Sequence, residues 1–142
     1  MSALVLIVGL AGQRVGIRAA EVESVVEIAD ITPVPGAPPH VVGLAALRSR
    51  VVTVIDGAVA LGSAAPTPVR AAAVATVDGH AYALLVDDVE DVLETSGDPR
   101  PLPGAVDGAW SRVARESVEA EGDLLLLIEV AELIAGPLAR AA

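Results

Sequence analysis

The stretch GLAALRSRVVTVID, residues 43–56, dictates how the rest of the chain can be arranged. Residues 51–55 are mainly β-branched side chains, which fit a pleated, half-buried surface and predict a core strand. Arg48 and Arg50 precede this strand and Asp56 follows it, so both ends carry charges that must lie at the surface or be paired. The prolines within residues 33–39 fix φ and lack an N–H, which predicts a turn or connector before the stretch.

Composition favours one domain with an aliphatic core. The chain has 142 residues, of which 54% are hydrophobic, but it contains one Trp, one Tyr and no Phe. It has no cysteine, which excludes disulfides, thiol catalysis and cysteine metal sites. The net charge of −10 argues against a nucleic-acid partner, because binding to phosphates needs a basic face.

The apolar runs are too short for a membrane protein. None reaches the roughly 18 residues that mark a membrane-spanning helix. Leu4–Leu10 is too short for the apolar part of a secretory signal and has no basic residue before it. We therefore expect a cytoplasmic protein with no direct insertion into the membrane.

The order of the segments predicts an all-β fold. Short apolar runs alternate with turn residues such as Asp78-Gly79, which is a hairpin signal. Strands are expected at residues 4–10, 15–19, 51–55, 72–77, 82–86 and 124–128. Helical turns are expected near residues 21 and 59, a connector at 97–107 and a short C-terminal helix at 131–135. The strands at 51–55 and 124–128 are predicted to be the two most buried, so Ile55→Ala and Leu126→Ala should each cost about 2–5 kcal/mol.

The second half of the chain repeats the first. A shift of about 67 positions aligns Gly12 with Gly79 and Ile17 with Leu84, and a shift of about 73 aligns residues 51–55 with 124–128. This indicates a duplicated β-unit, with approximate halves 1–66 and 67–142. Because a barrel of about 65 residues has a marginal core, the two halves should support each other as one domain, 1–142.

Patterns for catalysis or metal binding are missing. The acidic residues in 87–91 lack the alternating oxygen ligands, central glycine and late glutamate of a calcium loop, so they predict a solvated face. His40 follows two prolines and His80 lies in a hairpin, and no Gly-x-Ser-x-Gly turn supplies a nucleophile. We expect no enzymatic activity, no metal and no cofactor.

Four short segments follow one another within residues 35–56. They are Pro35-Gly36-Ala37-Pro38, Val42-Gly43-Leu44, Leu47-Arg48 and Val51–Asp56. In this order they resemble the CheW-like chemotaxis adaptor family, and the resemblance extends from Leu4 to about Ile134. Ser49, Thr53 and Gly57 depart from it, since the family has glycine, proline and leucine at these places.

The resemblance implies two intertwined SH3-like five-stranded β-barrels packed around a shared core. Whether the two barrels exchange strands at the seam stays open. It also implies a non-enzymatic adaptor that couples chemoreceptors to a CheA-type histidine kinase in two-component signalling. The partners would be the regulatory domain of the kinase and the cytoplasmic tip of the receptor.

The resemblance also implies site residues. Val22, Ser24, Gly43 and Arg48 are expected to bind the kinase, although the family often has a glutamate where Ser24 stands. Arg48, Val86, Asp87 and Val89 are expected to bind the receptor. In that arrangement Val86 and Val89 form the apolar floor of a groove at the seam, and Arg48 forms its charged rim.

Several alternatives stay open on the residues alone. Arg48 could pair with Asp56 or Glu27 at the end of the strand, where such a pair contributes little. Val22 could belong to the core, Gly43 could serve a tight bend, and Trp110 could be a core residue or an exposed anchor.

Other functions also stay open. The chain could be a divergent paralogue in another signalling array, or a small-molecule-binding β-barrel. An exposed apolar edge would favour the adaptor, and an enclosed pocket with converging polar groups would favour the small-molecule alternative.

Overall fold

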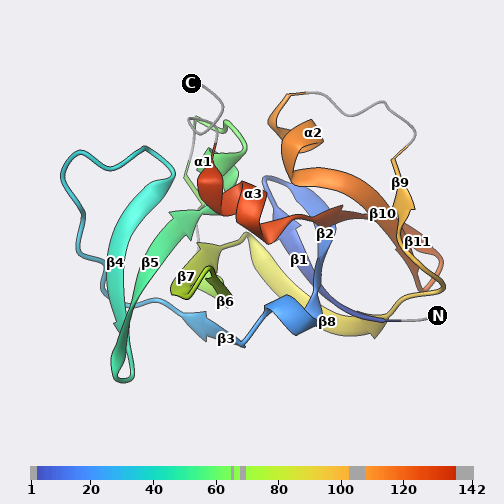
Figure 1. Ribbon diagram of the computed structural model, residues 1–142, viewed down its shortest axis with the longest axis horizontal. Helices are drawn as coiled ribbons and strands as arrows, with labels where there is room; N and C mark the ends of the chain where they lie inside the picture. The colour runs from blue at the N-terminus through green and yellow to red at the C-terminus, as the bar shows by residue number, and fades with distance from the viewer. Residues whose placement is uncertain (1–2, 65, 68–69, 103–107, 137–142) are drawn as a thin grey trace.

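The computed structural model describes residues 3–64, 66–67, 70–102 and 108–136 and shows a mostly β fold with two sheets (Figure 1). One sheet has six strands in the order β8-β1-β2-β11-β10-β9, and the other has five in the order β3-β6-β7-β5-β4. Figure 1 shows the five-stranded sheet on the left and the six-stranded sheet on the right, with α1 and α3 between them. The predicted all-β architecture is confirmed.

Six of the strands, β1, β2, β5, β6, β7 and β11, match the predicted runs to within two residues. The strands of the six-stranded sheet are β1 (Leu4–Leu10), β2 (Gln13–Arg18), β8 (Asp88–Glu94), β9 (Arg100–Pro101), β10 (Ala114–Ala120) and β11 (Asp123–Ile128). Those of the five-stranded sheet are β3 (Ser24–Glu27), β4 (Val41–Leu47), β5 (Arg50–Asp56), β6 (Ala71–Val77) and β7 (His80–Leu85). The helical elements are η1 (Ala19–Glu21), α1 (Gly57–Ala60), α2 (Ala109–Val113) and α3 (Val130–Ala135).

Six elements of the described residues were not predicted as strands or helices, namely β3, β4, β8, β9, β10 and α2. Strand β10 and helix α2 occupy a segment for which no strand or helix was expected, and Trp110 in α2 is half-buried against the central core. The predicted connector at 97–107 contains the short strand β9, and its residues 103–107 lie outside the described residues.

The predicted repeat is present in the register of the strands. The pair Leu6↔Val92 in β1 and β8 matches the pair Ala73↔Val25 in β6 and β3, at the shift of 67. The parallel pair Val15↔Leu126 matches the parallel pair Tyr82↔Thr53, because Val15 corresponds to Tyr82 at the shift of 67 and Thr53 corresponds to Leu126 at the shift of 73. The sheets are therefore two copies of one arrangement.

Each sheet combines strands from both halves of the chain. The six-stranded sheet takes the β1–β2 hairpin from residues 1–66 and its other strands from 67–142. The five-stranded sheet takes the β6–β7 hairpin from residues 67–142 and β3, β4 and β5 from 1–66. The halves 1–66 and 67–142 thus do not each build one sheet, because each gives its first hairpin to the other.

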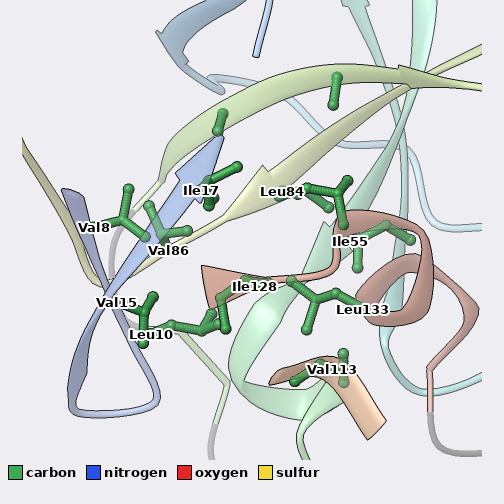
Figure 2. Packing of buried hydrophobic residues seen from close by; sticks show 14 of the residues in the cluster. Val8, Leu10, Val15, Ile17, Ile55, Leu84, Val86, Val113, Ile128 and Leu133 are labelled. Carbon is green, nitrogen blue, oxygen red and sulfur yellow. The ribbon is translucent and has the colours of Figure 1, made fainter. Parts of the chain in front are cut away.

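A central core joins the two sheets and the short helices (Figure 2). It contains side chains of β1, β2, β5, β6, β7, β11 and α3, among them Leu10, Ile17, Ile55, Ile128 and Leu133. Each sheet also has a smaller cluster of its own. Alternate residues of β1 enter the central core and the cluster of the six-stranded sheet, which explains its continuous apolar sequence.

The prediction of the two most buried strands is wrong. Strand β1 is the more enclosed element, because residues 5–10 are all buried. At the start of β5 and β11, Val51 is 63% exposed and Leu124 is 74% exposed. Both strands begin at hairpin turns outside the core, and their buried residues start only at Val52 and Leu125.

Helix α1 begins where a buried carboxylate caps it. Asp56 is 2% exposed, and its Oδ1 accepts hydrogen bonds from the N–H groups of Ala58 and Val59. Thr67 donates its N–H and its hydroxyl to the same carboxylate, so Asp56 also holds the loop after α1. Such a cap supplies a hydrogen-bond acceptor to N–H groups at the helix start that have none within the helix.

Among the described residues, none of the helices has the length and apolar character needed to cross a lipid bilayer.

Candidate functional site

The five-stranded sheet curls so that its edge strand β3 comes close to the β4–β5 turn on the opposite side of the sheet. Glu23, just before edge strand β3, accepts a hydrogen bond from Arg50 Nη2 at 2.7 Å, and these two side chains form an ion pair. The hydroxyl of Thr76 in β6 also donates to Glu23. These contacts hold β3 beside the β4–β5 turn, although β6 and β7 lie between β3 and β5 in the sheet.

The hydrogen bond from Thr76, followed by the one from Arg50, lowers the pKa of Glu23 below its ordinary value. Both donors stabilise the carboxylate form. Glu23 therefore stays negatively charged and balances the charge of Arg50 at neutral pH.

A pocket of about 360 Å³ lies between β3 and the turn. Ser24 and Val26 line it from β3, and Leu47, Arg48 and Ser49 line it from the hairpin. The structure therefore brings together two of the predicted kinase-binding residues, Ser24 and Arg48. The pocket opens to solvent, so a partner's side chain could reach it.

Arg48 carries an uncompensated charge in this pocket. Its backbone has a φ of +57°, and its side chain is exposed. Within the described part of the chain it has no hydrogen-bond or ion-pair partner, so the alternative of a pair with Asp56 or Glu27 is not observed. A cation beside the half-buried Val26 and Leu47 suits an acidic residue flanked by apolar ones.

The other two predicted kinase-binding residues lie apart from this pocket. Val22 is half-buried against the central core. Gly43 is buried, has a φ of +155°, and a Cβ there would lie 2.2 Å from the carbonyl oxygen of Thr32. Thr32 and Leu44 exchange two backbone hydrogen bonds at this point. A close approach of the chain to itself thus accounts for the glycine.

Three of the four predicted receptor-binding residues gather near the β1–β2 turn. Val86 is 1% exposed in the central core, where Figure 2 shows it among Val8, Val15 and Ile17. The Oδ2 atom of Asp87 accepts a hydrogen bond from Gly12 N at 2.7 Å. Val89 is half-buried and pairs with Val8.

Arg48 does not share a groove with Val86 in this structure. Strands β5 and β7 run parallel, with Thr53 opposite Tyr82 and Asp56 opposite Leu85. Val86 therefore lies beyond the Asp56 end of β5, whereas Arg48 precedes its Arg50 end. The seven residues of β5 separate these ends by about 20 Å at roughly 3.3 Å per residue.

The burial of Val86 also changes what a substitution there can test. An aspartate at position 86 would bury a carboxylate among apolar side chains, which is strongly destabilising. A Val86→Asp variant would therefore not separate receptor binding from folding.

Sequence reasoning did not identify Val26, Leu47 and the Glu23–Arg50 pair as parts of the site. The opposite charges of Glu23 and Arg50 were visible, but their meeting depends on how the sheet curls. Within the described residues, no group of three or more His, Asp or Glu side chains could hold a metal ion.

Comparisons with known proteins agree with the fold. A solved structure, the scaffolding protein TtCheW from Thermoanaerobacter tengcongensis, superposes with a TM-score of 0.79 and covers 90% of this chain and 89% of its own. The two sequences are 21% identical, so this likeness concerns the fold.

Sequence comparisons identify the family. The chemotaxis protein CheW of Rhizobium meliloti (strain 1021) is 35% identical over 102 residues, which are 70% of this chain and 66% of that protein. The chain thus matches slightly less than two thirds of this relative's length. The sequence model of the CheW-like domain matches residues 4–137, nearly the whole chain. The chain therefore belongs to the CheW-like domain family.

Proposed function

We propose that this chain is a non-enzymatic adaptor that couples chemoreceptors to a CheA-type histidine kinase in the cytoplasm. Its membership of the CheW-like domain family supports this role, together with the similarity to a chemotaxis protein and the fold of a scaffolding protein. A role in another signalling array of the same type is the main alternative.

The observation that carries the proposal is the Arg48 pocket. It offers an unpartnered cation and apolar side chains at the edge of a sheet, on a chain whose net charge is −10. The exposed Val25 in edge strand β3 and Val51 in β5 extend the apolar surface beside it. The regulatory domain of the kinase would dock here, with an acidic side chain on Arg48 and apolar residues on the valines. Ser24 would lie in the contact, with Val22 and Gly43 supporting the two strands.

The receptor tip would bind a different surface from the kinase. Asp87 and Val89 are the residues proposed for it, and Val86 supports them from the core. Because Arg48 lies beyond the opposite end of β5, its predicted part in receptor binding would require a receptor that extends across the sheet.

The kinase contact can be tested with purified proteins by calorimetry or interferometry, without nucleotide or metal. The parent is expected to bind the regulatory domain with a Kd near the micromolar range, roughly −8 kcal/mol. Arg48→Ala should weaken binding by about 1–2 kcal/mol, as a hot-spot arginine does. The matched control is Arg70→Ala, which removes an equally exposed arginine outside the pocket. Both variants should melt like the parent.

Each outcome decides a separate point. Equal binding by the two variants would reject the Arg48 surface while keeping the adaptor role. Absence of binding by the parent to the kinase and to a receptor-tip peptide would reject the adaptor role. For the peptide, Val89→Ala should weaken binding and Val51→Ala should leave it unchanged.

A further inference from the structure

A second pocket opens at one end of the six-stranded sheet. Its volume is about 530 Å³, and it lies between the start of β1, the η1 turn and the segment after β8. Val5, Val118 and Leu127 form its floor and belong to the apolar cluster of that sheet. Arg18, Ala19 and Thr95 stand at its rim. It shares no lining residue with the Arg48 pocket.

The other sheet shows that the rim is unusually poor in large apolar side chains. The repeat places Leu85, Val86 and Ile28 where the pocket has Arg18, Ala19 and Thr95. These three apolar side chains are each no more than 2% exposed, and Leu85 and Ile28 belong to the apolar cluster of the five-stranded sheet, whereas Val86 belongs to the central core. The corresponding end of the six-stranded sheet has an alanine, a threonine and an arginine instead.

The floor has changed in the opposite direction. Val5, Val118 and Leu127 stand where the other sheet has Ala72, Ala45 and Val54. The pocket therefore combines a larger apolar floor, whose three side chains are at most 3% exposed, with a less apolar rim, and the exposed Leu4 adds an apolar wall open to solvent. A continuous apolar hollow of this volume lies within the range of roughly 300–1,000 Å³ found for small-molecule sites.

The polar groups at the rim restrict the charge of an occupant. Arg18 lies 2.9 Å from Glu116, 3.4 Å from Glu129 and 3.7 Å from Glu21, so three carboxylates surround one cation. The hydroxyl of Thr95 accepts from Ala3 N and donates to Gly97 O, which leaves it little capacity for a ligand. The rim thus repels anions and offers few hydrogen bonds.

We propose that this pocket binds a neutral, largely apolar small molecule. Release of water from the apolar lining, which includes the exposed Leu4, would drive binding, and the excess of carboxylates around Arg18 would disfavour fatty acids and other anionic amphiphiles. This proposal does not depend on the adaptor function, because the pocket is separate from the proposed kinase surface.

The test uses the fluorescence of two ring probes of similar size but different charge. Neutral N-phenylnaphthylamine is expected to bind the parent at one saturable site, and anionic anilinonaphthalene sulfonate should bind at least about tenfold more weakly. Ala19→Val and Thr95→Ile restore side chains that the other sheet has at these positions. Each should weaken the neutral probe at least about tenfold.

Two controls separate filling of the pocket from damage to the fold. Val51→Ser changes an exposed apolar side chain on the other sheet and should bind the neutral probe like the parent. Thr95→Ile loses two hydrogen bonds, so Ala19→Val, which loses none that involve its side chain, is the decisive variant. Its melting temperature should equal or exceed that of the parent. Lack of saturable binding by the parent, or unchanged binding by a folded Ala19→Val, would overturn the proposal, as would tighter binding of the anionic probe.

Discussion

The β4–β5 turn and the β10–β11 turn occupy equivalent positions but carry opposite charges. Arg48, Ser49 and Arg50 in the first correspond to Glu121, Gly122 and Asp123 in the second. The residues that follow, Val51 and Leu124, are both strongly exposed. One backbone arrangement thus presents a basic tip and an acidic tip, each beside an apolar side chain.

The backbone of the two turns also differs. Glu121 and Gly122 both have positive φ, +50° and +83°, as in a type I′ hairpin turn. In the first turn only Arg48 does, at +57°, so the serine that replaces the family's glycine is accommodated by another turn type. The register is therefore maintained by the core, while the turns are free to differ in partner chemistry.

The largest effect is expected where the halves remain alike. Ile55 and Ile128 are equivalent, and both are at most 1% exposed in the central core. Ile55→Ala and Ile128→Ala should each lower the free energy of unfolding by about 2–5 kcal/mol, by lost burial and a residual cavity. Leu126→Ala should cost less, because Leu126 is half-buried. Chemical denaturation checks this, and a difference between the two isoleucines of more than about 2 kcal/mol would show that the halves share the core unequally.

A smaller and unequal effect is expected at the ends of β5 and β11. Asp56 caps α1 and holds Thr67, whereas Glu129 precedes α3 without a side-chain cap and reaches Arg18. Asp56→Ala should cost about 1–3 kcal/mol through the lost cap and unpaired N–H groups. Glu129→Ala should cost at most about 1 kcal/mol, as for other partly exposed ion pairs. If both variants lost the same free energy of unfolding in urea, the difference between the capped and the uncapped helix start would be contradicted.

Two glutamates near β3 should respond to pH in opposite directions. The pKa of Glu23 lies below its ordinary value of 4.5, so its contribution to stability is complete above that pH and is lost as the pH falls through the folded pKa. The pKa of Glu21 is raised, mainly by burial, so its cost to stability is present above the folded pKa and disappears on acidification towards and below 4.5.

Unfolding can be followed from about pH 7 to about pH 3 in the parent and in both glutamine variants. Glu23→Gln should be less stable than the parent at neutral pH, and the difference should vanish in acid. Glu21→Gln should be more stable at neutral pH, again with the difference vanishing in acid. The same sign for both variants would contradict the two environments.

The smallest effect on stability is expected at the two equivalent exposed residues, Val51 and Leu124. Val51→Ser and Leu124→Ser should each change the free energy of unfolding by less than about 0.5 kcal/mol, because surface substitutions rarely do more. A clear loss in thermal melting would mean that the starts of β5 and β11 are more enclosed than the structure shows.

The hairpins could be predicted because their turn signals are local. The repeat could be predicted because similar residues recur in the same order at shifts of about 67 and 73. Asp78-Gly79 and the glycine at position 12 supply the positive φ values that these turns require, at φ +52° and +81° for the first pair. Strand β10 could not be predicted, because its sequence ARESVEA has few β-branched residues. It is a strand because β11 pairs with it along its length.

The candidate site was predictable only in part, because contacts between distant parts of the chain bring its residues together. Arg48 and Ser24 followed from the resemblance, but the ion pair that joins their strands links residues 27 positions apart. The position of Val86 depends on a core shared by both sheets, which a single apolar strand does not reveal. Interpretation of one half at a time therefore placed Val86 at the surface.

The exchange of hairpins has a consequence for synthesis on the ribosome. Strand β1 needs β8 on one side, and β2 needs β11 on the other, with Val15 opposite Leu126. At about 5–20 residues per second, translation of the intervening chain takes on the order of ten seconds. During that time the nascent β1–β2 hairpin has neither neighbour, although β1 is apolar on both faces. A transcript that ended before β8 would leave this hairpin with exposed strand edges, which is the usual starting point of aggregation and degradation.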